Sequence, residues 1–234
     1  ASNKIMHITK ANVKSLVHRA VHLDYIGFKK FDKNGVIIAE IRFVGLFTSD
    51  SYNQRAQNIP YLDRKVRSVV ERSGFDYNSH DGKALFHILE TLPRDELFQI
   101  DAVPLFRTSI GILNLNLRPR CRAFVRKDKF ERFVSTLVFV PRELYNSILR
   151  TKIEKILCKA FNGELSSRYA QLSNDRIARW HFIIRTKPGK VPSPNTESIN
   201  KKISKVAQSW TDYFLEVLID RWGEEKASQL YRKY

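Results

Sequence analysis

The stretch SGFDYNSHDGKALFHILETLPRDELFQI, residues Ser73–Ile100, carries the strongest local structural signals of the chain. Gly74 predicts the end of a preceding helix, because glycine adopts the left-handed conformation of a helix C-cap at little cost. Ser79 predicts the N-cap of the next helix, and Pro93 predicts its end, since the residue before a proline is pushed out of the helical region. Between them, apolar residues recur at helical spacing, namely Leu85, Phe86, Ile88, Leu89 and Leu92. We therefore predict an αα-hairpin that turns at a polar corner, Arg94–Glu96.

Further helical patterns lie on both sides of this stretch. Pro60 fits the first turn of a helix, and an apolar stripe follows it, formed by Leu62, Val66, Val69 and Val70. Asp101–Leu115 predicts another helix. We group residues 58–117 as a helical connector, which a polar loop at Thr48–Gln57 joins to the front of the chain.

The front of the chain, residues 1–57, is predicted to be the β-rich end of a preceding domain. Residues up to about Val13 are predicted to be a ragged end. Apolar and polar residues then alternate over Val17–Tyr25, which is the period of a strand. Asp32–Gly35 contains Asn-Gly, a strong hairpin signal, and Val36–Phe47 supplies a returning strand rich in β-branched and aromatic residues.

Arg118-Pro119-Arg120 marks a predicted domain boundary, and residues 118–187 form the back domain. Strands are expected at Cys121–Arg126 and Phe133–Val140, followed by a helix over Arg142–Phe161. A second hairpin is expected from Ser166–Leu172 and Ile177–Arg185, around Ser173-Asn174-Asp175. Two hairpins with helices on one face make an α+β sandwich, so the fold class of the whole chain is predicted to be α+β.

Residues 188–234 are predicted to be a linker and C-terminal helices. The Pro-rich segment Lys187–Asn195 predicts a stiff connection. Thr196 is expected to cap a helix whose core side contains Trp210, Phe214, Val217 and Leu218. After Gly223, Glu224–Tyr234 begins a further helix.

The composition of the chain limits the classes of function. With 41 Lys and Arg against 24 Asp and Glu, the net charge is +17, which attracts polyanions. A basic α+β module that binds nucleic acid is therefore the alternative function, although the cations are dispersed and no RNP or helix-turn-helix motif is present. Cys121 and Cys158 form no CxxC pair and are expected to be buried thiols in a reducing cytoplasm. No stretch has the apolar length of a membrane span or the pattern of a signal peptide.

Two histidines near the front could be interpreted as metal ligands. His18 and His22 share a strand face with Asp24 in the predicted register. A row of solvated polar residues opposite a core row explains the same pattern, and we expect no metal site there.

Several long strings resemble one enzyme family, in the same order along the chain. Besides Ser73–Ile100 they are VHRAVHLDYIGFKKFD at Val17–Asp32, EIRFVGLFTSDSYN at Glu40–Asn53, IPYLDRKVRSVVERSGFD at Ile59–Asp76, RFVSTLVFVPRELYN at Arg132–Asn146 and SWTDYFLEVLIDRWGEEKASQLYRKY at Ser209–Tyr234. They resemble the large-subunit type of bacterial NAD-specific glutamate dehydrogenase, in the region before its catalytic domain. The resemblance implies a cytoplasmic, homo-oligomeric parent that oxidatively deaminates L-glutamate to 2-oxoglutarate and ammonia with NAD⁺. The partners of this segment would be the rest of the polypeptide and neighbouring subunits.

The resemblance also implies an ACT-like regulatory domain in the back half. The predicted ββ-α-ββ-α order differs from the βαββαβ order of a regular ACT unit, which leaves amino-acid binding open. In ACT units the effector lies near the turn between a strand and the first helix, here Val140–Asn146. Helix amides could hold a carboxylate there, with Arg142 as counter-ion and Asn146 as a polar partner; an ordinary helix cap is the alternative. None of the nine glycines forms GxG, so we expect neither a catalytic nor a cofactor site in this segment.

Overall fold

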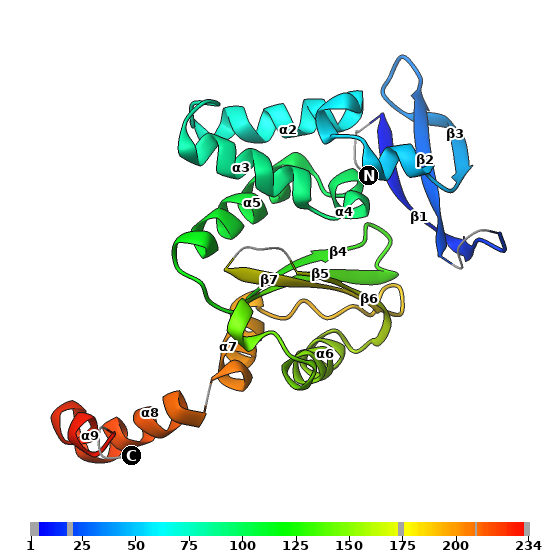
Figure 1. The fold of residues 1–234 in the computed structure, drawn as a ribbon. Coiled ribbons are helices and arrows are strands. Elements are labelled where there is room, and N and C mark those ends of the chain that lie inside the picture. Colours follow the sequence, from blue (N-terminus) through cyan, green and yellow to red (C-terminus); the bar gives the residue numbers. More distant parts are fainter. Residues whose placement is uncertain (1–4, 18–20, 173–175, 209, 232–234) are drawn as a thin grey trace. The chain divides into compact units, whose positions relative to one another are not determined.

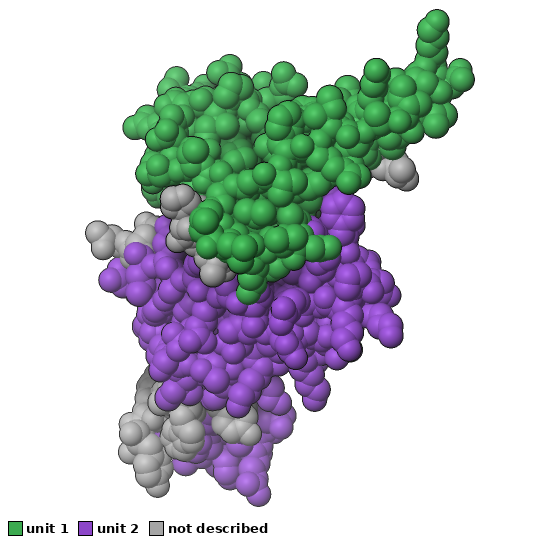
Figure 2. Space-filling model, turned by 90° about the vertical axis from the view of Figure 1, so that its right-hand side faces the viewer, with its two compact units in different colours: residues 1–117 green, residues 118–234 purple. Residues whose placement is uncertain are grey.

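The computed structural model describes residues 5–17, 21–172, 176–208 and 210–231. The chain folds into two compact units, residues 1–117 and 118–234, which Figure 2 shows in different colours. Every strand pair among the described residues is antiparallel, and in the first unit the helices follow the strands along the chain. The predicted α+β class is therefore confirmed. None of the described helices has the length and hydropathy needed to cross a membrane.

The first unit opens with a three-stranded sheet in the order β1 (Met6–Lys14), β2 (His22–Phe31), β3 (Ile37–Gly45). The hairpin predicted from Asn-Gly is confirmed, because the Asp32 carboxylate accepts hydrogen bonds from the amides of Asn34 at 2.9 Å and Val36 at 2.8 Å. Gly35 has a φ of 79°, which suits glycine.

Two predictions for this sheet were wrong. The segment expected to be a ragged end forms β1. Its apolar and polar residues alternate too weakly to predict a strand, and the strand forms through pairing with β2, for example Ile8 opposite Ile26. The strand expected to begin at Val17 begins at His22. Val17 lies in the connection between β1 and β2, where the amide of Ser15 donates to the carbonyl of Val21 at 2.8 Å.

The helices of the first unit are α1 (Ser49–Asn53), the 3₁₀ turn η1 (Ala56–Asn58), α2 (Pro60–Ser73), α3 (His80–Thr91), α4 (Arg94–Gln99) and α5 (Ala102–Leu117). The local signals of the opening stretch are confirmed. Gly74 has a φ of 69°, Ser79 Oγ accepts from the amide of Gly82 at 3.0 Å, and Leu92 before Pro93 ends α3. A Cβ on Gly82 would lie 2.1 Å from the Asp76 carbonyl oxygen, so the backbone approach requires glycine there.

The first unit is more helical than predicted at two places. The expected polar loop after β3 contains α1 and η1, and the expected polar corner opens α4. Contacts distant in sequence stabilise these short helices. The Glu90 carboxylate accepts from the amide of Ala56 at 2.9 Å, and the carbonyls of Leu97, Phe98 and Ile100 accept from the ammonium of Lys65 at 2.7, 3.0 and 2.7 Å.

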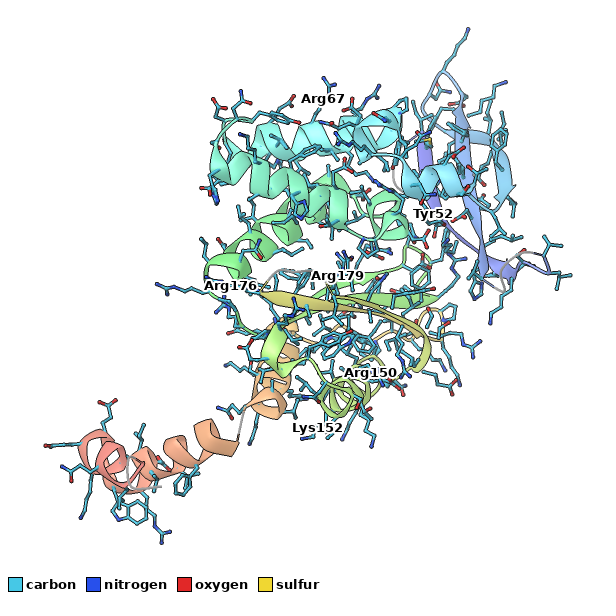
Figure 3. The ribbon with its side chains drawn as sticks, viewed as in Figure 1. Tyr52, Arg67, Arg150, Lys152, Arg176 and Arg179 are labelled. Carbon is cyan, nitrogen blue, oxygen red and sulfur yellow. The ribbon has the colours of Figure 1, made fainter. Side chains whose placement is uncertain are left out.

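A partly buried ion-pair network joins the sheet of the first unit to its helices. Lys10 Nζ on β1 lies 2.6 Å from Asp24 Oδ1 on β2 and 3.1 Å from Asp95 Oδ1 on α4. The hydroxyl of Tyr52 on α1, labelled in Figure 3, donates to Asp95 at 3.0 Å, and the amide of Phe47 donates to Asp24 at 3.0 Å. One hydrogen-bonded network of charged and polar groups therefore connects the sheet to the helices of the first unit.

This network makes the first unit sensitive to alkaline pH. Burial lowers the pKa of Lys10, but the carboxylates of Asp95 and Asp24 outweigh burial and the net shift is upward from 10.5. Burial and then the charge of Asp95 raise the pKa of Tyr52 from 10.0 to about 12. In the unfolded chain both groups lose their protons at lower pH, so the stability they contribute is present at neutral pH and is lost as pH rises through these folded-state values.

We expect Tyr52→Phe to reduce the loss of stability between pH 10 and 12, because phenylalanine cannot ionise. At neutral pH the variant should be less stable by about 1 kcal/mol, since it lacks the hydrogen bond to Asp95. Melting temperatures from circular dichroism across this pH range test both effects. Tyr77→Phe, at an exposed tyrosine, is the matched control. Equal alkaline loss in Tyr52→Phe and the unsubstituted protein would contradict the role of Tyr52.

The second unit contains β4 (Arg122–Lys127), β5 (Phe133–Pro141), the 3₁₀ turn η2 (Arg142–Leu144), α6 (Ser147–Phe161), β6 (Glu164–Gln171), β7 (Ile177–Arg185) and α7 (Thr196–Ala207). The predicted ββ-α-ββ-α order is confirmed, and the sheet order is β4-β5-β7-β6. The turn expected at Ser173-Asn174-Asp175 lies outside the described residues.

One face of this sheet carries the core of the second unit. Figure 1 shows α6 and α7 on the same face of the sheet. Alternate residues of β5 and β7 point to this face, and Val138 lies beside Trp180 on the neighbouring strand. The helices contribute Leu149, Ile153, Leu157, Phe161, Ile199 and Ile203 to the same cluster. Trp180 is 1% exposed and stacks on Tyr145 with ring centroids 4.5 Å apart.

Three predictions for the second unit were wrong in detail. The long helix begins at Ser147 and not at Arg142, because Arg142–Leu144 form η2 and Asn146 caps the helix. The N-cap of α7 is Asn195, whose side chain accepts from the amide of Glu197 at 2.8 Å, and not Thr196. The predicted single C-terminal helix divides into α7 and α8 (Trp210–Trp222), and α9 (Glu224–Tyr231) follows. Of its expected core side, Leu218 is buried but Val217 is 40% exposed; the side chain of Trp210 lies outside the described residues.

Candidate functional site

The turn between β5 and α6 contains both residues predicted to bind an effector. Pro141 ends β5, and η2 places Arg142 at the surface. The side-chain oxygen of Asn146 accepts from the amide of Leu149 at 2.8 Å, and its Nδ2 donates to the carbonyl of Leu144 at 3.1 Å. Asn146 is therefore the helix cap that was the alternative interpretation. Any role in binding would use the N–H that remains on its amide group.

The fold brings one further arginine to this turn that the sequence did not indicate. The amide of Arg142 donates to the carbonyl of Arg176 at 2.9 Å. Figure 3 shows Arg176 where the chain enters β7. With Glu143 as the acid within the turn, Arg142 and Arg176 give the turn a net positive charge.

The opening of α6 adds hydrogen-bond donors to this charge. The amides of Ser147 and Ile148, in the first turn of α6, have no carbonyl to reach within the helix. Together with the positive end of the helix dipole, such amides stabilise a carboxylate. Tyr145, stacked on Trp180, holds the turn against β7. The β5–α6 turn thus offers the chemistry to bind a small carboxylate such as that of an amino acid.

A groove of about 970 Å³ lies between α7 and the start of β4 and is a second, more polar candidate site. Thr196, Asn200 and Ser204 recur every four residues and form one side of it. Asn200 Oδ1 accepts from the amide of Ala123 at 2.7 Å, which fixes α7 against β4. Its charged lining residues are Arg120, Arg122, Lys201 and Lys205 against Glu197 and Asp220. The groove also attracts anions, although it is open and its polar residues mostly face solvent.

The groups that could suggest metal or thiol chemistry have other roles. Asp24 binds Lys10, and His18 lies outside the described residues. Within the described part of the chain, no cluster of three His, Cys, Asp or Glu residues is placed to hold a metal ion. Burial, with a smaller contribution from Glu143, raises the pKa of the Cys121 thiol to about 11, so it stays protonated at neutral pH. Cys121 and Cys158 are both unpaired thiols.

The two halves of the chain match two parts of one enzyme family. Residues 122–211 match the family described as glutamate dehydrogenase, ACT2 domain, and residues 59–118 match glutamate dehydrogenase, helical motif 1. Over 231 residues the chain is 37% identical to the NAD-specific glutamate dehydrogenase of Halomonas elongata, with 99% of this chain and 14% of that protein covered. This chain corresponds to a segment of the large NAD-specific glutamate dehydrogenases.

Other relatives of this glutamate dehydrogenase segment agree. The NAD-specific glutamate dehydrogenase of Pseudomonas aeruginosa is 34% identical over 226 residues, covering 97% of the chain and 14% of that protein. The protein of that name from Mycobacterium tuberculosis is 28% identical over 222 residues, covering 90% and 14%. The chain therefore spans 14% of the length of these relatives.

The residues of this segment do not fit a bound NAD. A dinucleotide site needs parallel strands joined by a helix, with a glycine-rich turn at the helix start that approaches the pyrophosphate. Here all the described strand pairs are antiparallel. The described glycines with positive φ are Gly35, Gly74, Gly189 and Gly223, and none of them follows a strand and opens a helix within a glycine-rich motif. No step of hydride chemistry can be derived from these residues.

Proposed function

We propose that this chain is a regulatory and architectural segment of an NAD-dependent glutamate dehydrogenase and has no active site of its own. The longer protein would deaminate L-glutamate oxidatively with NAD⁺, and the residues that bind NAD and react with glutamate would lie outside these 234 residues. The observation that carries the proposal is the antiparallel β4-β5-β7-β6 sheet, with α6 and α7 on one face, in the region that matches an ACT2 domain.

Glutamate-dependent NAD⁺ reduction tests this division of labour. We expect the full-length protein to reduce NAD⁺ when glutamate is present, and the 234-residue chain alone to show no turnover above background. The supporting physical reason is that neither sheet offers the parallel strand–turn–helix that cradles a pyrophosphate. Turnover by the 234-residue chain would refute the non-catalytic role.

We further propose that the β5–α6 turn binds the carboxylate of an amino-acid effector, with Arg142 as counter-ion. Arg142, the neighbouring Arg176 and the first amides of α6 support this assignment. We expect Arg142→Ala to weaken amino-acid binding at least tenfold, because a charge-assisted hydrogen bond contributes about 1.5–3 kcal/mol. Isothermal titration of the amino acid that raises the melting temperature most measures the change.

Two further variants separate this site from its alternatives. Lys155→Ala, at an exposed lysine in the middle of α6, removes the same charge away from the turn and should leave affinity unchanged. Lys201→Ala removes a cation from the α7 groove. Unchanged affinity in Arg142→Ala together with weakened binding in Lys201→Ala would move the effector to the groove and contradict our assignment.

A further inference from the structure

Strand β3 exposes large apolar side chains along its whole length. Figure 1 places it at the outer edge of the three-stranded sheet. Ile37, Ile41 and Phe43 are 41%, 61% and 57% exposed. Single exposed apolar residues are common, but a contiguous group of them marks an interaction surface.

Ile41 and Phe43 share one face of the sheet with Phe28 on β2. Phe28 lies opposite Ile41 and contacts Phe43 edge to face with ring centroids 6.0 Å apart. A β-bulge next to Ile37 turns that residue to the other face. We call Phe28, Ile41 and Phe43 the β3 patch. The same face is covered elsewhere, since Ile8 is buried and Lys10 reaches Asp95 on α4. The β3 patch is thus the uncovered part of a face that is otherwise packed.

Beyond the β-bulge next to Ile37, the edge of β3 has few of the features that protect an edge strand from pairing. Among the described residues β3 pairs with β2 alone, which leaves one row of backbone groups facing outward. Its charged residues are Glu40 and Arg42, which bind each other at 2.9 Å, and it contains no proline. On the opposite face Ile38 and Val44 are also exposed. A strand with apolar residues on both faces is typical of one that is covered by other parts of a protein.

Charge decides which kind of partner fits. Lys30 on β2, on the face of the β3 patch, and Lys33 in the hairpin turn make the rim of the patch basic. A second copy of the chain would bring an identical basic rim and another +17 of charge. Opposite charges at the rim of an interface favour association, and like charges oppose it. The rim therefore favours an acidic partner over a second copy.

We propose that the β3 patch is the docking surface for a segment of the longer polypeptide, outside these 234 residues, with an apolar centre and Asp or Glu at its rim. This inference rests on the proposed function, because it takes the chain as part of a longer enzyme. The length of the relatives supports it, since this chain covers 14% of each and the rest supplies the partner.

Photo-crosslinking in the purified full-length protein tests the docking surface. Phe43 is replaced by the photoreactive analogue p-benzoylphenylalanine, and mass spectrometry identifies the attached peptide. We expect a peptide from outside residues 1–234 that combines apolar and acidic residues. Adding Ile41→Lys should lower the yield at least tenfold, because a charge then lies in the apolar centre. Ile219→Lys, at an exposed apolar residue of α8, should leave the yield unchanged.

Two results would overturn the inference. Attachment to residues 1–234 of a second copy would make the β3 patch a dimer interface. Absence of attachment, together with hydrogen exchange of the outward β3 amides at the rate of an unstructured peptide, would show the patch to be bare. Glutamate-dependent NAD⁺ reduction is measured on the same preparation. The expected attachment without that activity would refute the proposed function and leave the docking surface intact.

Discussion

Replacing Lys65 with methionine should lower the free energy of unfolding of the first unit by roughly 3–5 kcal/mol, because buried acceptors lose their charged donor. Lys65 is 8% exposed on α2, and its ammonium binds three carbonyls at the C-terminal end of α4. Those carbonyls have no partners within their own helix. The ammonium also lies 4.6 Å from the centre of the Tyr61 ring. Methionine fills nearly the same space, so the loss reports the missing hydrogen bonds more than a cavity.

The distribution of tryptophan makes this result easy to assign. Trp180, Trp210 and Trp222 all belong to the second unit. Denaturation of Lys65→Met followed by circular dichroism should therefore show a destabilised transition that tryptophan fluorescence does not show. Lys83→Met, at an exposed lysine of α3, should change stability by less than about 0.5 kcal/mol. Equal stability of the two variants would mean that Lys65 does not hold α4.

Replacing Trp180 with alanine should destabilise the second unit by about 3–5 kcal/mol, the cost of removing a large aromatic side chain from a core. Trp180 contacts Tyr145 on one side and lies with its ring 6.5 Å from that of Phe182 on the other. The loss should extend to function, because Tyr145 positions the β5–α6 turn. We therefore expect weaker amino-acid binding as well as lower stability.

Trp222→Ala is the matched control for this change. Trp222 is 44% exposed on α8, so its removal should cost less than about 1 kcal/mol. The stabilities of both variants are compared by circular dichroism, because each variant lacks one of the tryptophans that give the fluorescence signal. A loss in Trp180→Ala no larger than in Trp222→Ala would contradict the description of the core.

Local sequence signals predicted much of the fold. Gly74, Ser79 and Pro93 act through their own backbone preferences, so they hold in any context. The strand predicted over Phe133–Val140 is also confirmed as β5, and every residue from Val134 to Pro141 is buried.

Features that depend on distant contacts could not be predicted in the same way. β1 becomes a strand through its pairing with β2, and α4 is held by Lys65 from another helix. At the candidate site, the sequence indicated Arg142 but not Arg176, because only the carbonyl of Arg176 beside the amide of Arg142 reveals their proximity. The same limit applies to the groove beside α7, whose spacing of polar residues is also that of an ordinary solvent-facing helix side.

We propose that this segment binds an amino acid and does not bind NAD⁺. A thermal-shift scan of the chain against the twenty amino acids, 2-oxoglutarate and NAD⁺ tests it most directly. A ligand at a hundred times its Kd stabilises the native state by about 2.7 kcal/mol, a rise of roughly 5–10 °C for a chain of this size. We predict such a rise with one or two amino acids, its loss in Arg142→Ala, and no rise with NAD⁺. A rise with NAD⁺ and with no amino acid would contradict the account.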